Sequence, residues 1–288
     1  MARRVEDLGY SCLTLPDHFD AQLAPVPALM AAAAVTENLR VGSLVWDNDY
    51  KHPLVLAKEL ATMDVLSDGR LEIGIGAGWM ISDYEQAGMT YDPAGVRIDR
   101  FVEGLTIIKG LMADGPFSFT GRHYTISGHD GTPKPVQSPR PPILIGGGGK
   151  RVLSIAAREA DIVGINATMS AGVVGREAFD TMTAEAVEGK VNIVREAAGD
   201  RWNEIEMNIR AFLVNITPDT AGAADGIGRM IGVTPDEVLA TPFALVGPPE
   251  KLVDDLLARR DRWGFSYVIV GGDDIESFAP VVGALAGR

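Results

Sequence analysis

The chain has 288 residues, of which 46% are hydrophobic and 23% are charged; this composition excludes disordered, collagen-like and coiled-coil proteins and leaves room for one large domain or two small ones. Asp and Glu number 39 against 26 Lys and Arg, so the net charge is −13, which argues against nucleic-acid binding because an acidic surface repels phosphate. The single cysteine, Cys12, excludes an internal disulfide, and no apolar run reaches the roughly 18 residues of a membrane span.

Short apolar runs alternate with amphipathic stretches from one end of the chain to the other. This pattern predicts strands at 11–15, 39–46, 71–75, 142–145, 161–165, 206–216 and 267–270. It predicts helices at 2–8, 27–36, 53–66, 97–112, 150–159, 179–198, 250–263 and 277–285. The strands are apolar on both faces, which is typical of a parallel sheet covered by helices. About seven strand–helix units in one chain favour an α/β fold of the (β/α)8 TIM-barrel type over an open sheet, as a single domain over 1–288.

Two regions interrupt the alternation. An irregular excursion around 113–142 is rich in proline and contains a predicted β-hairpin, and a long loop-rich segment is predicted around 216–244. A shorter loop is predicted at 169–175. Long loops in a compact domain tend to be functional or mobile, and in a barrel they lie over the catalytic face.

The first glycine-rich turn follows the strand at 71–75 and contains Gly74, Gly76 and Gly78. It fails the dinucleotide fingerprint G-x-G-x-x-G because Trp79 stands at the sixth position. Ser82 and Glu85 have the spacing of a capping box, so a helix is predicted next. The glycines either let a ligand approach the backbone or pack tightly under that helix, and the residues alone favour neither.

The second glycine-rich turn, Gly146-Gly147-Gly148-Gly149, joins a strand to a helix that begins with Lys150-Arg151. Leu144 and Arg151 occupy positions where a phosphate-binding P-loop requires glycine and Ser or Thr. The turn still presents free backbone N–H groups at a helix start, which is an anion-binding arrangement. A flexible connection is the alternative, but four glycines in a row cost conformational entropy and favour a function.

Asp17-His18 follows the strand at 11–15, where a histidine can act as an acid or base near neutral pH. Taken alone, such a pair is more often an exposed loop pair. The four histidines have no metal-binding spacing, and no G-x-S-x-G nucleophile motif occurs. The strand at 39–46 contains Gly42, which marks a bulge or a close approach of a ligand.

The order of these motifs is similar to that of a known family. Asp17-His18 is followed by Gly42-Ser43-Leu44, by D-G-R-L-E-I-G-I-G-A-G-W at 68–79, and by I-L-I-G-G-G-G at 143–149 with A-A-R-E-A-D at 156–161. The chain resembles the luciferase-like monooxygenase superfamily over nearly its whole length, in the branch that uses the deazaflavin coenzyme F420. The resemblance implies a TIM barrel with an insertion.

The resemblance also implies roles for individual residues. His18 is the implied catalytic acid or base, and Ser43-Leu44 is the implied site of a non-proline cis peptide behind the cofactor ring. The implied cofactor-binding residues are Asp17, Ser43, Leu44, Gly76, Ala77, Gly78, Gly146, Gly147, Gly148 and Gly149. On this basis we expect Gly148→Val to weaken cofactor binding while leaving the fold intact.

The chain departs from the deazaflavin sugar-phosphate dehydrogenases of this superfamily. They carry a catalytic Glu where this chain has Trp79, and a Trp where it has Gln22. This difference argues against sugar-phosphate oxidation. It suggests instead an apolar substrate pocket involving Trp46, Trp79 and Tyr84.

The function implied by the resemblance is an oxidoreductase that transfers a hydride between F420 and a small organic substrate. The alternatives are an FMN-dependent luciferase-like monooxygenase and a non-catalytic flavin- or deazaflavin-binding protein. We expect a cytoplasmic homodimer without a metal, a nucleic-acid partner or a membrane partner.

The beginning of the sequence departs from the superfamily pattern, in which a first barrel strand precedes the helix before Asp17-His18. Residues 2–10 read as the end of that helix. We therefore expect a barrel lacking its first strand in this chain, with about 20–30 upstream residues completing it. The alternative is a seven-stranded variant whose open edge is covered by a partner chain.

Overall fold

The computed structural model describes residues 1–168 and 176–287, and the loop predicted at 169–175 lies outside them. The chain forms two compact units. Unit 1 comprises residues 1–6 and 11–144, and unit 2 comprises residues 7–10 and 145–288.

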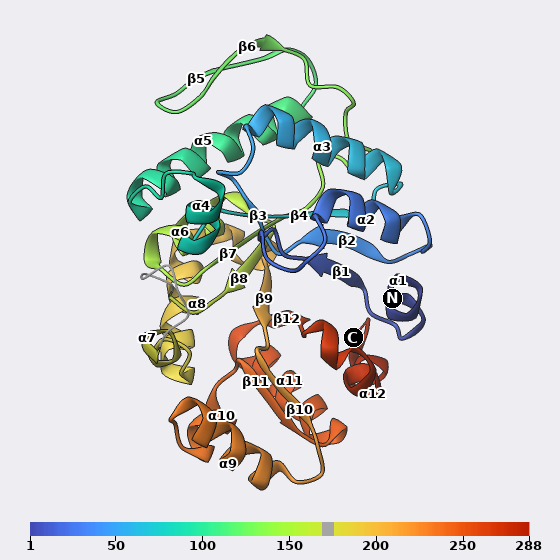
Figure 1. Cartoon of the computed structure of the whole chain (residues 1–288), viewed down its shortest axis with the longest axis vertical. Coiled ribbons are helices and arrows are strands. Elements are labelled where there is room, and N and C mark those ends of the chain that lie inside the picture. The colour runs from blue at the N-terminus through green and yellow to red at the C-terminus, as the bar shows by residue number, and fades with distance from the viewer. Residues whose placement is uncertain (169–175, 288) are drawn as a thin grey trace. The chain divides into compact units, whose positions relative to one another are not determined.

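Unit 1 contains a parallel sheet in the order β1-β2-β4-β7, with the short strand β3 paired to β4. Helices α3 and α5 lie side by side, and the antiparallel hairpin β5–β6 extends beyond them (Figure 1). The strands are β1 (Cys12–Leu15), β2 (Arg40–Ser43), β3 (Trp46–Asp47), β4 (Leu71–Gly76), β5 (Phe117–Thr120), β6 (Thr125–His129) and β7 (Ile143–Gly147), whose last three residues belong to unit 2. The helices are α1 (Ala2–Asp7), α2 (Pro25–Ala33), α3 (Pro53–Leu66), α4 (Ile81–Ala87) and α5 (Ala94–Met112).

The register of this sheet aligns the ends of its strands. Leu15 pairs with Ser43, and Ile73 pairs with Ile143. Every residue of β4 is buried, since helices cover this part of the sheet, whereas all four residues of β1 are half-buried. The carboxyl ends of parallel strands meet at one edge, so the segments after β1, β3 and β4 are brought together there.

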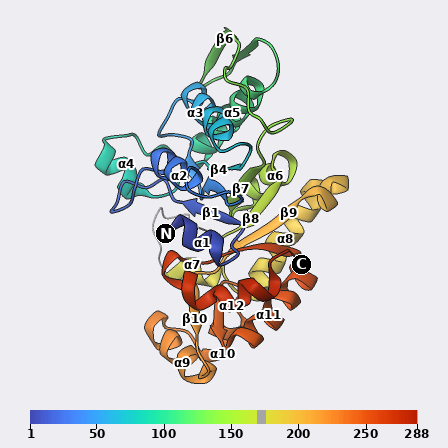
Figure 2. The ribbon, with the colours of Figure 1, turned by 90° about the vertical axis from the view of Figure 1, so that its right-hand side faces the viewer.

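Unit 2 contains two parallel sheets. One continues from β7 in the order β7-β8-β9-β12, and the other pairs β10 with β11. Helices α9 and α10 lie together beside β10, at the end of the unit away from β8 (Figure 2). The remaining strands are β8 (Ile162–Ile165), β9 (Glu206–Arg210), β10 (Leu213–Ile216), β11 (Ala244–Gly247) and β12 (Phe265–Ile269). The helices are α6 (Lys150–Glu159), α7 (Arg176–Asp180), α8 (Ala184–Ala198), α9 (Thr220–Ile231), α10 (Pro235–Ala240), α11 (Pro249–Trp263) and α12 (Ile275–Leu285), with short 3-10 helices η1 (Gly199–Glu204) and η2 (Gly272–Asp274).

The prediction of an α/β fold with parallel strands is confirmed, and so is the hairpin in the excursion around 113–142. The bounds of α3 and α6 match the predicted ranges 53–66 and 150–159. A closed eight-stranded TIM barrel stays a prediction. No helix within 1–168 and 176–287 is long and apolar enough to cross a membrane.

The prediction of a loop-rich segment around 216–244 is wrong. This segment forms α9 and α10, which pack with β10 and β11 around the buried side chains of Ala224 and Val238. A capping box starts α10, since Thr234 and Glu237 bond each other's backbone N–H groups. The high content of Gly, Ala, Thr and Pro was interpreted as a loop signal because Gly and Pro have low helix propensity, although the apolar residues of α9 have helical spacing.

Three predicted elements are interrupted. The strand at 206–216 divides into β9 and β10, which belong to different sheets. The helix at 179–198 ends at Asp180 and restarts after Thr183, whose side chain caps α8 by accepting a bond from the Ala186 N–H. The strand at 39–46 is interrupted between β2 and β3.

Candidate functional site

The centre of the candidate site in unit 1 is a hydrogen-bonded group of His18, Asp83 and Tyr50. His18 follows β1, and its Nδ1 lies 2.6 Å from Oδ2 of Asp83 in α4. The Tyr50 hydroxyl donates to the same carboxylate oxygen at 2.8 Å. Asp83 is buried, with 3% of its side chain exposed, while His18 is 22% exposed. A carboxylate oxygen accepts, so the network assigns the proton of the neutral imidazole to Nδ1.

The other ring nitrogen of His18, Nε2, has no hydrogen-bond partner among residues 1–168 and 176–287. With Nδ1 protonated, Nε2 carries the lone pair that can accept a proton. A buried carboxylate that orients a partly exposed histidine in this way is an arrangement that catalytic bases use. The group can therefore take up and return one proton at a defined atom.

Aromatic rings surround this group. The ring of Trp79 meets that of His18 edge to face, with ring centroids 5.8 Å apart. Phe19 stacks on Tyr50 at 4.5 Å and leaves 47% of its own surface exposed. The exposed side of the His18 group is thus bordered by apolar surface, which suits a small organic molecule better than a strongly hydrated one.

A second polar cluster lies behind the first. The Tyr84 hydroxyl lies within hydrogen-bond distance of Asp49 at 3.0 Å and of Asp47 at 3.2 Å, and the guanidinium of Arg100 binds both oxygens of Asp49, at 2.7 and 2.6 Å. Burial raises the pKa of Asp47 to about 7. Burial also raises the pKa of the Tyr84 and Tyr50 hydroxyls, so both stay protonated and act as donors.

Asp17 points towards this second cluster. Its Oδ2 accepts a 3.3 Å bond from the backbone N–H of Asp47, and burial raises the pKa of its carboxyl. The predicted pair Asp17-His18 is therefore divided between two hydrogen-bond networks. His18 joins Asp83, and Asp17 anchors the start of the segment after β3.

The glycines of the first turn are required by close packing. A Cβ on Gly74 would overlap the backbone carbonyl of Ser43, and one on Gly76 would lie 3.0 Å from Cγ2 of Val45. Gly78 has a φ of +73°, and its missing Cβ leaves room for the Tyr84 hydroxyl. Of the two interpretations that the sequence left open, the structure supports tight packing here. Contact of Gly76, Ala77 and Gly78 with a cofactor stays a prediction.

The predicted cis peptide occurs one bond further along the chain. The bond between Leu44 and Val45 is cis, whereas the resemblance implied Ser43-Leu44. Ser43 is buried, and its hydroxyl donates to the Leu15 carbonyl at 2.8 Å. Leu44 and Val45 are half-buried. Of the predicted pair Ser43-Leu44, only the Leu44 side chain is therefore partly accessible.

The second glycine turn lies in unit 2, between β7 and α6. A Cβ on Gly148 would overlap the backbone of Ala167, so Gly148→Val would disturb the fold, contrary to our expectation. Gly149 differs, because no atom of residues 1–168 and 176–287 lies within 4 Å of its Cβ position. Gly149 is the N-cap of α6, and within these residues no side chain caps this helix. The turn therefore offers an open helix N-terminus that an anion can occupy.

The predicted substrate pocket is only partly supported. Trp46 and Tyr84 are fully buried, at 1% and 0% exposure, so neither side chain presents a surface to a substrate. Tyr84 serves the polar cluster instead. Trp79 is half-buried against His18 and keeps its place in the prediction.

Sequence reasoning missed Asp83 and Tyr50. It interpreted Ser82 and Glu85 as a capping box, but α4 begins at Ile81 with Met80 as its N-cap and no side-chain cap bond. Tyr50 follows β3 and Asp83 follows β4, and the carboxyl ends of these strands lie at the same edge as that of β1. The predicted parallel sheet was therefore the signal that could have identified them.

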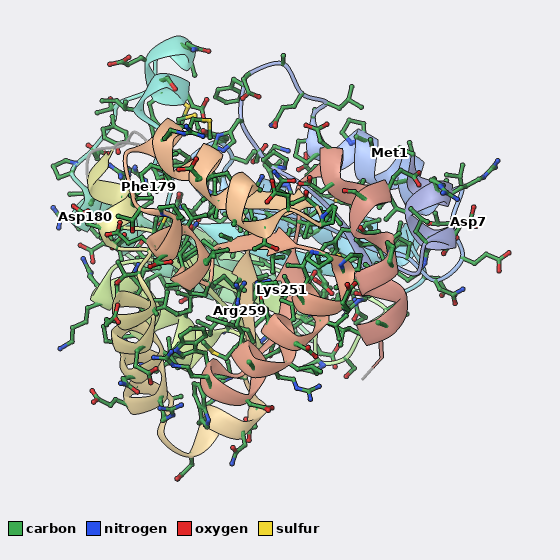
Figure 3. The ribbon with its side chains drawn as sticks, turned by 90° about the horizontal axis from the view of Figure 1, so that it is seen from below. Met1, Asp7, Phe179, Asp180, Lys251 and Arg259 are labelled. Carbon is green, nitrogen blue, oxygen red and sulfur yellow. The ribbon has the colours of Figure 1, made fainter. Side chains whose placement is uncertain are left out.

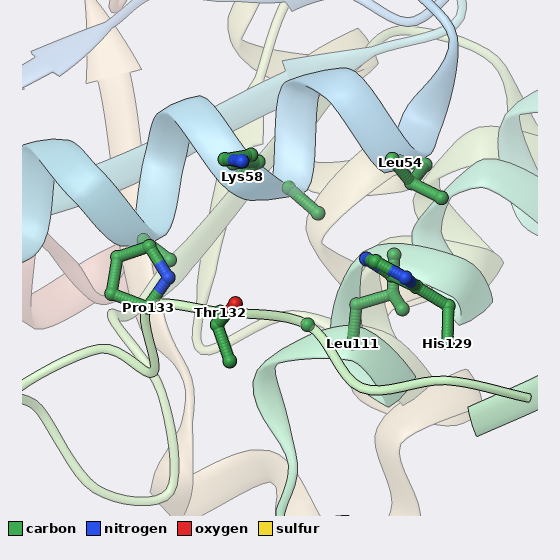
Figure 4. A pocket seen from close by; sticks show the side chains of 9 residues that line it. Leu54, Lys58, Leu111, His129, Thr132 and Pro133 are labelled. Atoms are coloured by element: carbon green, nitrogen blue, oxygen red, sulfur yellow. The ribbon is translucent and has the colours of Figure 1, made fainter. Parts of the chain in front are cut away.

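A small pocket elsewhere in unit 1 does not include the candidate site. Leu54 and Lys58 of α3 face Leu111, His129 and Pro133 across it (Figure 4). None of the predicted site residues lines this pocket.

The family model described as luciferase-like monooxygenase matches residues 1–267. The chain belongs to this family. It is 26% identical over 195 residues to an FMNH(2)-dependent dimethylsulfone monooxygenase of Pseudomonas putida, covering 68% of this chain and 50% of that protein. It is 30% identical over 164 residues to an F420-dependent glucose-6-phosphate dehydrogenase of Microbacterium testaceum, covering 54% of this chain and 48% of that protein. The chain thus spans about half the length of the curated relatives it matches.

The fold is shared with solved members of the F420 group. The coenzyme F420-dependent tetrahydromethanopterin reductase of Methanopyrus kandleri superposes with a TM-score of 0.78 at 20% identity, covering 98% of this chain and 92% of that one. The resemblance inferred from the sequence motifs is therefore confirmed at the level of family and fold. The relatives include both F420-dependent and FMN-dependent proteins.

Proposed function

We propose that this protein is an oxidoreductase that transfers a hydride between coenzyme F420 and a small organic substrate. The observation that carries the proposal is the contact of His18 Nδ1 with the buried Asp83 carboxylate at 2.6 Å, while Nε2 has no partner among the residues that the structure describes. When bound, F420 supplies the hydride acceptor or donor that no amino-acid side chain provides.

The residues of the chain then manage the proton. In the oxidation of an alcohol, Nε2 of His18 accepts the hydroxyl proton as the hydride leaves the carbon, and in a reduction the same atom returns a proton. Asp83 holds the ring in the tautomer that this requires and stabilises the imidazolium once it forms. Tyr50 fixes the Asp83 carboxylate through its 2.8 Å bond.

The chain also has residues that fit the anionic part of such a cofactor. The N-terminus of α6 lacks a side-chain cap, the space at Gly149 is open, and Lys150 and Arg151 follow it. Free N–H groups there suit a phosphate, and they matter in a protein whose net charge is −13. In unit 1, the half-buried Leu44 and Val45 offer apolar surface for a flat ring.

A second candidate function is an FMN-dependent monooxygenase. The dimethylsulfone monooxygenase relative, with 68% of this chain covered, favours it. Nothing in the uncapped α6 N-terminus distinguishes the two cofactors, because both carry a phosphate group.

Titration of the purified protein with F420 and with FMN, followed by fluorescence, tests the proposal. We expect tight binding of F420 and turnover of at least one member of a panel of alcohols, ketones and enones. Binding of FMN alone would replace the proposal by the monooxygenase, and F420 binding without any turnover would leave a carrier protein. Where the wild-type protein binds F420 and converts a substrate, His18→Ala should lower turnover far more than cofactor affinity. Equal losses in both would mean that His18 only packs against the cofactor.

A further inference from the structure

Lys190 of α8 is a buried cation without a carboxylate partner within 1–168 and 176–287. Only 6% of the residue is exposed, and its Nζ donates to two backbone carbonyls, those of Asn166 and Thr181, each at 2.7 Å. Burial lowers the pKa of this amine to about 8. Burying an unpaired ammonium costs free energy, so carbonyl oxygens must stabilise it here, and an apolar residue would avoid that cost.

The segment that contains Asn166 is hydrogen-bonded to the glycine turn. It is also hydrogen-bonded to the segment that contains Thr181. The backbone N–H of Asn166 donates to the Gly147 carbonyl at 2.9 Å, and the Thr168 hydroxyl donates to the Gly148 carbonyl at 3.1 Å. The Thr168 N–H in turn donates to the Thr181 hydroxyl at 2.9 Å. Lys190 therefore holds Asn166 and Thr181 together, and Thr181 in turn binds Thr168. These bonds fix the position of residues 166–168.

Residues 166–168 press directly on the turn. A Cβ on Gly148 would overlap the carbonyl group of Ala167, so the two backbones are in contact. A shift of residues 166–168 must then move Gly148, and α6 begins only two residues later, at Lys150. The orientation of the first N–H groups of α6 consequently depends on the segment that Lys190 holds.

We propose that Lys190 is a positioning residue that keeps the glycine turn and the N-terminus of α6 in the form that binds the anionic group of the cofactor. The identity of that anion rests on the proposed function, but the effect of Lys190 on the turn does not. Four consecutive glycines have a flexible backbone, and the hydrogen bonds of the Lys190 ammonium hold the segment that packs against them.

Unit 2 contains a matched control for the merely structural role of a buried cation. Arg259 of α11 is 8% exposed and donates to the carbonyls of Pro242 and Ala244 at 3.0 and 2.7 Å. Like Lys190, it is a helical cation that bridges two backbone carbonyls. Its partners lie at the start of β11 rather than at the glycine turn. Arg259 shares α11 with Lys251 (Figure 3), which pairs instead with the partly exposed Asp255 at 2.6 Å.

The test compares Lys190→Met with Arg259→Met in the full chain without cofactor. It uses hydrogen exchange of three hydrogen-bonded amides: those of Asn166 and Thr168, and that of Leu153, which donates to the Gly149 carbonyl at 3.1 Å and reports on the start of α6. We expect Lys190→Met to speed exchange at these amides about 10-fold and to raise the dissociation constant of F420 by a similar factor, with little change in turnover at saturating cofactor. Arg259→Met should lower the melting temperature but leave exchange at these three amides and F420 affinity unchanged.

Thr168→Val provides a second variant in case Lys190→Met does not fold. It removes the bond to the Gly148 carbonyl without touching the buried amine, and we expect faster exchange at the same amides. The proposal is wrong if neither variant changes exchange at the amides of Asn166, Thr168 and Leu153, or if Arg259→Met changes it as much. If the wild-type protein binds neither F420 nor FMN, the proposed function fails, and the exchange result still decides the role of Lys190.

Discussion

The two glycine-rich turns look alike in the sequence, since each joins a parallel strand to a helix, yet they differ in what surrounds them. At Gly74, Gly76 and Gly78 every missing side chain makes room for another part of unit 1. At Gly149 the missing side chain leaves open space in front of an uncapped helix. The first turn therefore serves packing within unit 1, whereas the second is packed at Gly148 and open at Gly149, where we propose that the anion binds.

Counting glycines after a strand predicts a close approach, but it does not say whether the protein or a ligand makes that approach. The atoms around each Cβ position decide the question. We therefore expect variants at Gly74, Gly76 and Gly78, and also at the packed Gly148 of the second turn, to affect folding, and variants at Gly149 to affect cofactor affinity.

The largest expected effect is that of Gly74→Ala. Its Cβ would overlap the Ser43 carbonyl, a backbone group that cannot move aside without distorting β2. We expect a loss of about 3 kcal/mol or more in the free energy of unfolding, measured by urea denaturation, or no soluble protein at all. Gly149→Ala is the matched control and should change stability by less than about 1 kcal/mol. Equal effects of the two substitutions would remove the distinction between the turns.

The second prediction concerns Asp83→Asn, in the helix that follows the first turn. The amide removes the carboxylate that orients His18, so turnover should fall by about 10² or more while F420 affinity changes little. The measurement is kcat on whichever substrate of the panel the wild-type protein converts. Asp130→Asn, which alters an exposed aspartate paired with Lys134, is the control. A drop in F420 affinity as large as the drop in kcat would show that Asp83 serves binding instead.

The third prediction gives opposite signs for two properties of one variant. Gly149 has an extended backbone, with φ of −97°, so Asp fits there and can cap α6. Gly149→Asp should therefore raise the melting temperature slightly, while its charge lowers F420 affinity about 10-fold. Gly149→Ser caps the helix without adding charge and should cost less affinity. Tighter F420 binding by the Asp variant would exclude an anion at this turn.

The sequence predicted those elements whose boundaries carry strong local signals. Helix α3 begins at Pro53 after His52, and α6 starts at Lys150, directly after four glycines, so both were placed to the residue. The helices within 216–244 were missed although Thr234 and Glu237 form a capping box that the sequence already contained. The Gly- and Pro-rich composition outweighed both this cap signal and the helical spacing of the apolar residues in α9.

The sequence predicted site residues that lie next to a recognisable motif, but not the partners that are distant along the chain. His18 was found because it follows a strand, but its partners Asp83 and Tyr50 lie 65 and 32 positions further along the chain. The bonds between them arise from the register of β1, β2 and β4, which no local pattern specifies. For the same reason the sequence could not assign Lys190 to the glycine turn, because the link runs through Asn166 and Thr181.

The last prediction concerns the pH dependence of stability, which arises from a buried carboxyl beside the first turn. The Asp47 carboxyl behind the first turn is 8% exposed, and burial raises its pKa to about 7. The folded chain therefore keeps this proton at pH values where the unfolded chain, whose carboxyl pKa is near 4, has lost it. The stability contributed by Asp47 is complete below about pH 4 and is lost as the pH rises through about 7.

Asp47→Asn keeps the shape of this side chain and removes its titration. Relative to the variant, the wild-type protein should lose about 1 kcal/mol of unfolding free energy per pH unit between pH 5 and pH 7, measured by urea denaturation at each pH. Asp225→Asn, at an exposed aspartate paired with Arg229 in α9, should instead follow the wild-type curve. If the Asp47→Asn curve also runs parallel to that of the wild type, Asp47 is ionised throughout this range, and the packing behind the first turn holds a charge rather than a proton.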